Sequence, residues 1–284
     1  MPEKPNSPTS SLKFSGVLLL VLGANTAAPA LARLSLLRIR DFMLPSLTAT
    51  NAYLGLLPAI LRAADPELFA HLAAADVQPH YAIAATLTLY AHDIEEYGSI
   101  ARLFDFLLAR EAVVTVYMYA AILISRRKEL FQFEADEPEM LYVTMSKLPK
   151  PLNLEALISR TTSLFAQHPP ESLPFRAWSR VSGNSVLKTT RDPQKLIKQS
   201  LEDGETYFRK HTAEIERQEA RQKMLQQTRS VALKYRRPAG ALGFAIVVGI
   251  LSVWLGRNGQ LTGSSIFDGL RYRVWDVFNL LLRR

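Results

Sequence analysis

The clearest repeat of apolar positions in the chain lies between Ser99 and Leu108. Its apolar residues have the spacing i, i+3, i+4, i+7 and i+8: Ile100, Leu103, Phe104, Leu107 and Leu108. This spacing predicts an amphipathic helix with one continuous apolar stripe. The following stretch, 112–125, is apolar on nearly every side, which predicts a helix that is buried all round. Since no run alternates apolar and polar residues, the pattern predicts an all-α fold.

Other helices are predicted from apolar spacing and from residues that start or stop helices. The segments are 17–37, 51–64, 67–74, 80–92, 138–145 and 153–167. Two Asp-Pro pairs, at Asp65 and Asp192, each place an N-cap residue directly before a proline suited to the first helical position. Residues 1–13 are rich in proline and serine and are expected to be disordered.

The expected domain organisation follows from changes in composition. A helical domain is predicted over 14–170, ending at Pro169-Pro170. Residues 171–192 mix Pro, Ser, Gly, Asn and Thr, which predicts a linker. Residues 193–237 are dense in charged residues and predict a basic, solvated helical stalk. A coiled coil is the weaker alternative there, because the apolar residues do not sustain a heptad.

An uncharged apolar stretch covers 238–256, which is about the length needed to cross a membrane as one helix. Pro238, Phe244, Trp254 and Gly256 mark this predicted anchor, and Trp254 stands where aromatic residues suit the membrane interface. A buried core helix is the alternative. Residues 257–284 place apolar residues on one helical face, which predicts an amphipathic tail on the far membrane surface.

Cationic residues set the expected orientation of this anchor. Lys234, Arg236 and Arg237 stand directly before the anchor. The stretch of about 20 residues before the anchor contains six Lys and Arg, whereas the stretch of the same length after it contains three. The N-terminal bulk is therefore expected in the cytosol, with the chain crossing the lipid bilayer once. Contact with anionic lipid explains much of the net charge of +8. Nucleic-acid binding is not expected, because the basic stretch lacks interleaved aromatic residues.

Composition excludes several chemistries. The chain has no cysteine, so disulfides, thiol nucleophiles and cysteine-ligated metals are excluded. No Gly-rich nucleotide motif occurs, and the five histidines lack metal-binding spacing, so neither a cofactor nor a metal is expected. The residues around Val17 to Leu22 also fit a short signal peptide, which leaves a lumenal protein with a C-terminal anchor as a further alternative.

A family resemblance emerges from the order of several motifs. These are Arg38-Ile39-Arg40-Asp41-Phe42-Met43, Leu54 to Phe69, Leu87-Thr88-Leu89-Tyr90, and Arg102-Leu103-Phe104-Asp105 with its apolar continuation, then Leu157 to Arg160 and Leu164-Phe165. This order resembles the C-terminal half of a TBC domain, the all-α GTPase-activating domain for Rab GTPases. Together with the predicted anchor, the chain resembles the membrane-anchored branch that acts at the endoplasmic reticulum in early secretory traffic.

The resemblance implies a Rab-type GTPase as partner, contacted by exposed positions of 38–53 and 76–98. Family members use an arginine in Ile-x-x-Asp-x-x-Arg and a glutamine in Tyr-x-Gln-Gly, and neither motif occurs in these 284 residues. No catalytic residue is therefore assigned. Arg40, Asp41, Arg102 and Asp105 are expected to be structural; Arg102 and Asp105 are spaced to pair with each other or with nearby backbone.

Two functions stay open at this point. One is a Rab GTPase-activating protein that is incomplete or inactive as given, and the other is a non-catalytic, membrane-tethered helical adaptor. Half of a domain is also expected to expose apolar surface on Val17 to Leu22 and on Ala112 to Ile124.

Overall fold

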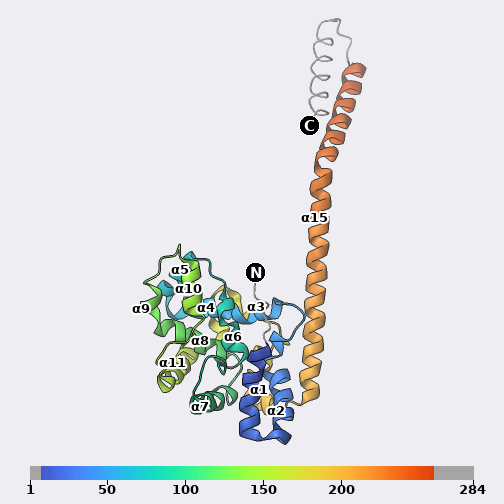
Figure 1. Cartoon of the computed structure of the whole chain (residues 1–284). Coiled ribbons are helices and arrows are strands. Elements are labelled where there is room, and N and C mark those ends of the chain that lie inside the picture. Colours follow the sequence, from blue (N-terminus) through green and yellow to red (C-terminus); the bar gives the residue numbers. More distant parts are fainter. Residues whose placement is uncertain (1–7, 259–284) are drawn as a thin grey trace. The chain divides into compact units, whose positions relative to one another are not determined.

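The structure is a computed structural model that describes residues 8–258, without the side chains of 8–14, 193, 229–246 and 251–258. It divides into two compact units, residues 1–219 and 220–284. Every regular element within residues 8–258 is a helix, so the predicted all-α fold is confirmed (Figure 1).

The structure consists of helices connected by short segments. Their bounds are α1 Pro8–Leu22, α2 Ala24–Arg38, η1 Arg40–Phe42, α3 Thr48–Leu54, α4 Leu56–Ala64, α5 Pro66–Ala74, η2 Pro79–Ala82, α6 Ile83–Leu87, α7 Tyr97–Leu108 and α8 Val114–Ser125. The remaining elements are α9 Arg127–Leu130, α10 Pro138–Met145, α11 Leu154–Gln167, η3 Pro170–Ser172, η4 Pro174–Arg176, α12 Ala177–Arg180, α13 Val186–Thr189, α14 Pro193–Lys198 and α15 Leu201–Asn258.

Helix α8 forms the centre of the core. All residues from Val114 to Leu123 are buried, as its apolar sequence predicts, and α8 packs against both α4 and α11. The expected exposure of Ala112 to Ile124 is therefore wrong, because neighbouring helices of this chain cover it. The expected exposure of 17–22 holds only for Leu19 to Leu22, since Val17 and Leu18 are buried.

Helix boundaries follow the predicted caps where a side chain makes the cap. The main-chain N–H of Leu68 donates to Asp65 at 3.0 Å, and that of Gln194 donates to Asp192 at 3.0 Å. The helix predicted over 51–64 is instead two helices that meet at Gly55. A Cβ at this position would lie 2.9 Å from the carbonyl oxygen of Asn51, so the tight junction requires glycine there.

The linker predicted over 171–192 is part of the core. Short helices form there, and Leu173, Ala177, Val181, Val186 and Leu187 are buried in the same cluster as α8. The prediction from composition is wrong because the prolines and serines of this segment begin short helices. The apolar residues beside them are buried against the core. The domain therefore continues beyond its expected end at residue 170, and its compact unit reaches residue 219.

The stalk predicted over 193–237 also begins inside this unit. On α15, Gly204, His211 and Ile215 are buried, and Ile215 forms a second apolar cluster with Leu44 and Ala49. The first turns of α15 are therefore a packed part of the domain rather than a solvated stalk. At the other end of the chain, Pro8 to Lys13 is helical, although disorder was expected over 1–13; residues 1–7 lie outside the described part.

In the second unit, the backbone of α15 is helical as far as Asn258. Among the residues whose side chains are described, no helical stretch is long and apolar enough to cross a membrane. The side chains that mark the predicted anchor (Pro238, Phe244, Trp254 and Gly256) and the basic residues before it (Lys234, Arg236 and Arg237) lie outside the described side chains. The predicted tail over 257–284 lies almost entirely outside the described residues.

Candidate functional site

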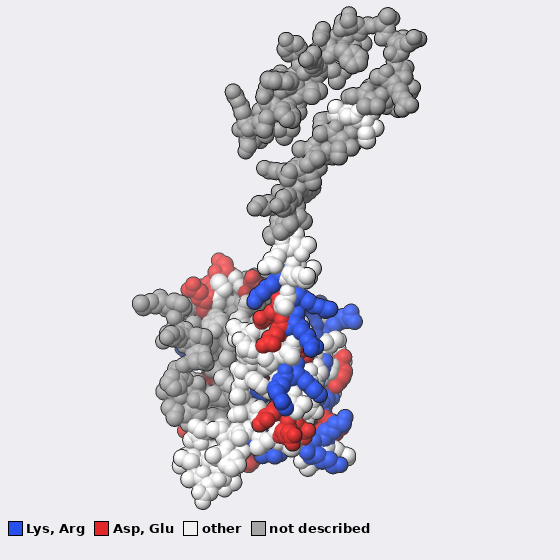
Figure 2. All heavy atoms as spheres, turned by 90° about the vertical axis from the view of Figure 1, so that its right-hand side faces the viewer, with Lys and Arg blue, Asp and Glu red and all other residues white. Residues whose placement is uncertain are grey.

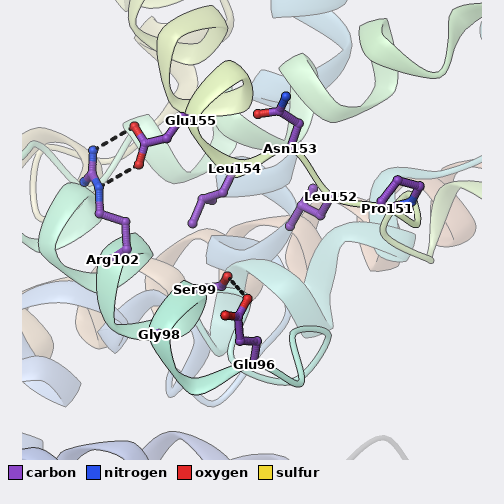
Figure 3. A pocket seen from close by; sticks show the side chains of 9 residues that line it. All are labelled: Glu96, Gly98, Ser99, Arg102, Pro151, Leu152, Asn153, Leu154 and Glu155. Atoms are coloured by element: carbon purple, nitrogen blue, oxygen red, sulfur yellow. Dashed lines mark hydrogen bonds and ion pairs between the residues drawn. The ribbon is translucent and has the colours of Figure 1, made fainter.

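An open cleft lies between the start of α7 and the segment that leads into α11 (Figure 3). Its volume is about 610 Å³, and it is lined by residues from two stretches: Glu96, Gly98, Ser99, Arg102, Pro151, Leu152, Asn153, Leu154 and Glu155. The amphipathic pattern of α7 explains the position of Arg102, because the apolar stripe of this helix faces the core and leaves Arg102 at the surface.

Arg102 joins the two sides of the cleft. Its Nε and Nη2 donate to the two carboxylate oxygens of Glu155 at 2.8 and 3.1 Å (Figure 3). The pairing of Arg102 with Asp105 that their spacing allows does not form. Asp105 is exposed on the same helix, and Arg102 instead links α7 to α11. The side chains of the pair are 45% and 68% exposed, so the contribution to stability is about 0–1 kcal/mol.

The other polar groups of the cleft are engaged locally. The hydroxyl of Ser99 donates to Glu96 at 2.6 Å, and Asn153 caps α11 by accepting from the main-chain N–H of Ala156 at 3.1 Å. Within the described residues, no group of three acidic or histidine side chains could hold a metal ion. An open cleft with Leu152 and Leu154 between charged groups suits contact with a protein surface rather than enclosure of a small ligand.

A second polar cluster, formed by Arg40, Asp41, Ser185 and His211, lies inside the domain. The guanidinium of Arg40 is fully buried and donates to the carbonyl oxygens of Leu36 and Asn184 at 2.8 and 2.6 Å. It also donates to Thr189 and lies 5.1 Å from the ring centre of Tyr207. Burial lowers the pKa of Arg40 to about 10, which still leaves it charged at neutral pH.

Asp41 supplies the negative charge of this cluster. Its carboxylate accepts hydrogen bonds from the hydroxyl of Ser185 and from the main-chain N–H of Val186 at 3.1 Å. The Nδ1 atom of His211 on α15 lies 3.6 Å from the same carboxylate. The hydrogen bonds of Arg40 and Asp41 join η1 to the start of α13, and His211 of α15 packs beside the same carboxylate. Both side chains are thus engaged in contacts within the fold.

Arg38 is engaged in the same way. It is buried, and its guanidinium donates to the main-chain carbonyls of Leu108 and Arg110 at the end of α7. Burial lowers the pKa of Arg38, against the opposing influence of Tyr53 and Glu111. Neither Arg38 nor Arg40 is therefore free to reach a phosphate of a bound nucleotide.

The regions expected to face a GTPase are only partly exposed. In 38–53 the exposed apolar side chains are Met43 and Leu47, whereas in 76–98 the exposed aromatic residue is Tyr97 beside the cleft. Sequence reasoning missed the roles of Glu155, Ser185 and His211. Their partners lie 53 to 170 positions away in the chain, and no local pattern signals pairs at that separation.

The segment from α1 through α9 corresponds in sequence to a known domain family. Residues 13–131 match the family model of the Rab-GTPase-TBC domain. The all-α fold and this match place the chain among proteins similar to Rab GTPase-activating proteins of the TBC type.

Two curated relatives make the similarity more specific. The chain is 33% identical over 202 residues to "GTPase-activating protein gyp10" of Schizosaccharomyces pombe, which covers 70% of this chain and 53% of the relative. It is 32% identical over 172 residues to human "TBC1 domain family member 20", covering 61% of this chain and 42% of the relative. The chain thus spans about half the length of the curated relatives it matches.

Proposed function

We propose that this chain binds a Rab-type small GTPase as part of a GTPase-activating protein of the early secretory pathway. The observation that carries the proposal is the match of residues 13–131 to the Rab-GTPase-TBC domain. The name of the S. pombe relative, a GTPase-activating protein, supports the same class of partner. The GTPase is expected to contact the exposed Met43, Leu47 and Tyr97, because these side chains lie in the two stretches, 38–53 and 76–98, that the family resemblance assigns to the GTPase-facing surface.

We further propose that residues 238–256 hold the chain in a membrane, with residues before them in the cytosol. The support is the uncharged apolar sequence of this stretch and the cationic Lys234, Arg236 and Arg237 before it. The resemblance to the membrane-anchored TBC branch favours the endoplasmic reticulum as the compartment.

Deleting residues 238–256 is expected to move the protein from the membrane fraction to the soluble fraction. The intact chain should resist extraction with alkaline carbonate, because a spanning helix is effectively irreversibly inserted. Protease added to sealed vesicles should digest residues 8–228 and leave 257–284 protected. Extraction of the intact chain by carbonate would disprove the anchor, and the reverse protection pattern would favour the signal-peptide alternative.

The chain as given is expected to bind a GTP-loaded Rab but to accelerate GTP hydrolysis little. An arginine finger contributes about 10³–10⁵ in rate, and no arginine here lies in the family's finger motif, while Arg38 and Arg40 are buried. Single-turnover hydrolysis by early-secretory Rabs, measured with the full chain in proteoliposomes, tests this. A stimulation of about a hundredfold or more would contradict the expectation.

Binding and hydrolysis together separate the proposal from the adaptor alternative. Selective binding of the GTP-loaded Rab, without stimulation, supports a TBC fragment that keeps part of the GTPase-docking surface. Absence of binding to every Rab, with an intact fold by circular dichroism, would favour a membrane-tethered adaptor for other partners.

A further inference from the structure

One stretch of the chain is strongly acidic and another of equal length is strongly basic. Residues 129–146 contain five Asp and Glu and no Lys or Arg, although the whole chain has a formal net charge of +8. Residues 220–237 contain six Lys and Arg and no Asp or Glu. Surfaces of opposite charge attract one another and suppress contact with wrong partners, so the two stretches are complementary.

The acidic stretch forms an exposed surface on α10 and on the loop before it. Met140 and Val143 are three positions apart on α10 and are 50% and 45% exposed, and Glu139 lies on the same side of the helix. We call this surface the acidic face; it consists of Glu134, Asp136, Glu137, Glu139, Met140 and Val143. Within the described residues, no ion pair engages any of its carboxylates. The acidic face thus combines an apolar centre with unpaired negative charge.

The basic stretch begins where the first compact unit ends, at Glu219, and it continues along α15. Met224 and Leu225 are each 70% exposed, and the neighbouring Arg221 and Lys223 are exposed as well. Figure 2, in which α15 faces the viewer, shows blue Lys and Arg side chains on the described part of this helix and uncharged side chains at its upper end. We call residues 220–228 the basic arm. It combines exposed apolar side chains with positive charge.

Lipid head groups do not account for the charge of the basic arm. Met224 lies 14 positions before Pro238, where the proposed anchor begins, and this separation is about 20 Å along a helix. The attraction of an anionic membrane falls off over a Debye length of about 8 Å. On a helix that stands upright on the membrane, Arg221 and Lys223 are therefore beyond its reach. Their complement is an acidic surface on a protein.

We propose that the basic arm of one copy of the chain docks on the acidic face of a second copy. The contact would cover the apolar side chains of both surfaces and would pair the cations of the arm with the carboxylates of the face. Because each copy carries both surfaces, a two-fold symmetric pair makes the same contact twice. The second contact forms at the raised effective concentration that the first provides.

Single cysteines can report this contact, because the chain has no native cysteine. One full-length variant carries Val143→Cys on the acidic face, and a second, with a tag of different mass, carries Leu225→Cys on the basic arm. The control pairs Leu225→Cys with Ile197→Cys on α14, an apolar position that is 82% exposed. The variants are mixed in detergent, with a large excess of micelles so that two copies rarely share one by chance, and are mildly oxidised.

The expected result is a disulfide between the two tagged copies at positions 143 and 225 that forms at least about tenfold faster than the control pair. Raising the salt concentration should slow the reaction, because surface charges are screened. Equal rates for the two pairs would overturn the proposal. A chain that carries both cysteines and closes a disulfide within itself, at a rate independent of protein concentration, would also overturn it, since the arm would then occupy its own acidic face.

Reversal of the charges tests the pairing itself. Asp136→Lys with Glu139→Lys, placed on the copy with Val143→Cys, should slow the cross-link about tenfold or more, because like charges then face each other. Arg221→Glu with Lys223→Glu, placed on the other copy, should do the same, and the two reversed copies mixed together should regain most of the original rate. Lys198→Asp on α14 is the control and should leave the rate unchanged. Loss of the cross-link without recovery in the mixture would contradict the proposed contact.

Discussion

Replacement of Arg40 by alanine is expected to lower the free energy of unfolding of the first unit by about 3–5 kcal/mol. The change removes a buried positive charge that interacts favourably with the nearby carboxylate of Asp41. It also removes the donors to the carbonyl oxygens of Leu36 and Asn184. Urea denaturation of the full chain in detergent, followed by near-ultraviolet circular dichroism, measures the effect through the packed tyrosines.

Arg102→Ala is the matched control for this prediction. Both arginines belong to the residues expected to be structural, yet Arg102 lies at the surface with an exposed partner, Glu155. Its loss should cost less than about 1 kcal/mol. Equal effects of the two substitutions would mean that the buried cluster does not hold the domain together.

Replacement of Gly204 by leucine is expected to force the start of α15 away from the domain. A Cβ at this position would lie 2.9 Å from the Cβ of Leu36 and 3.1 Å from the Cδ2 of Leu37, so a larger side chain overlaps with α2. Overpacking of this kind costs about 1–3 kcal/mol. Trypsin should then cut faster at Arg209 and Lys210, which would be released from a packed helix.

Gly98→Leu provides the control for the glycine prediction. At Gly98 a Cβ meets only the carboxylate of Glu96 at 3.8 Å, so the added side chain has room. The substitution should be neutral or stabilising by up to about 1 kcal/mol, since glycine disfavours a helix. Unchanged proteolysis in Gly204→Leu would show that α15 is not held at this contact.

Local pattern was enough to predict the elements whose environment is set by their own residues. The stripe of α7, the all-round burial of α8 and the cap at Asp65 depend on neighbours within four positions or on a uniformly apolar sequence. The same reasoning failed for 171–192, because prolines and serines are common both in linkers and in short helices packed on a core. Only the tertiary contacts of Val186 and Leu187 distinguish the two.

The candidate site was less accessible to sequence reasoning. The spacing of Arg102 and Asp105 allowed a pair within one helix, but Arg102 reaches Glu155 across the cleft. The structural character expected of Arg40 and Asp41 agrees with their burial. Their partners Asn184, Ser185 and His211 could not be foreseen, since hydrogen bonds between distant segments leave no periodic trace in one sequence.

The long separation of these partners has a consequence for how the protein folds during synthesis. Arg40 and Asn184 are 144 positions apart, so the cluster closes only after most of the first unit has left the ribosome. Contacts of such high sequence separation are slow to form, because the loop between them must first be ordered. Until His211 has emerged from the ribosome, η1 lacks its contact with α15. The charged side chains of Arg40 and Asp41 are then not yet buried as they are in the folded domain. Folding intermediates before that point are therefore expected to be substrates for chaperones, which bind exposed apolar surface.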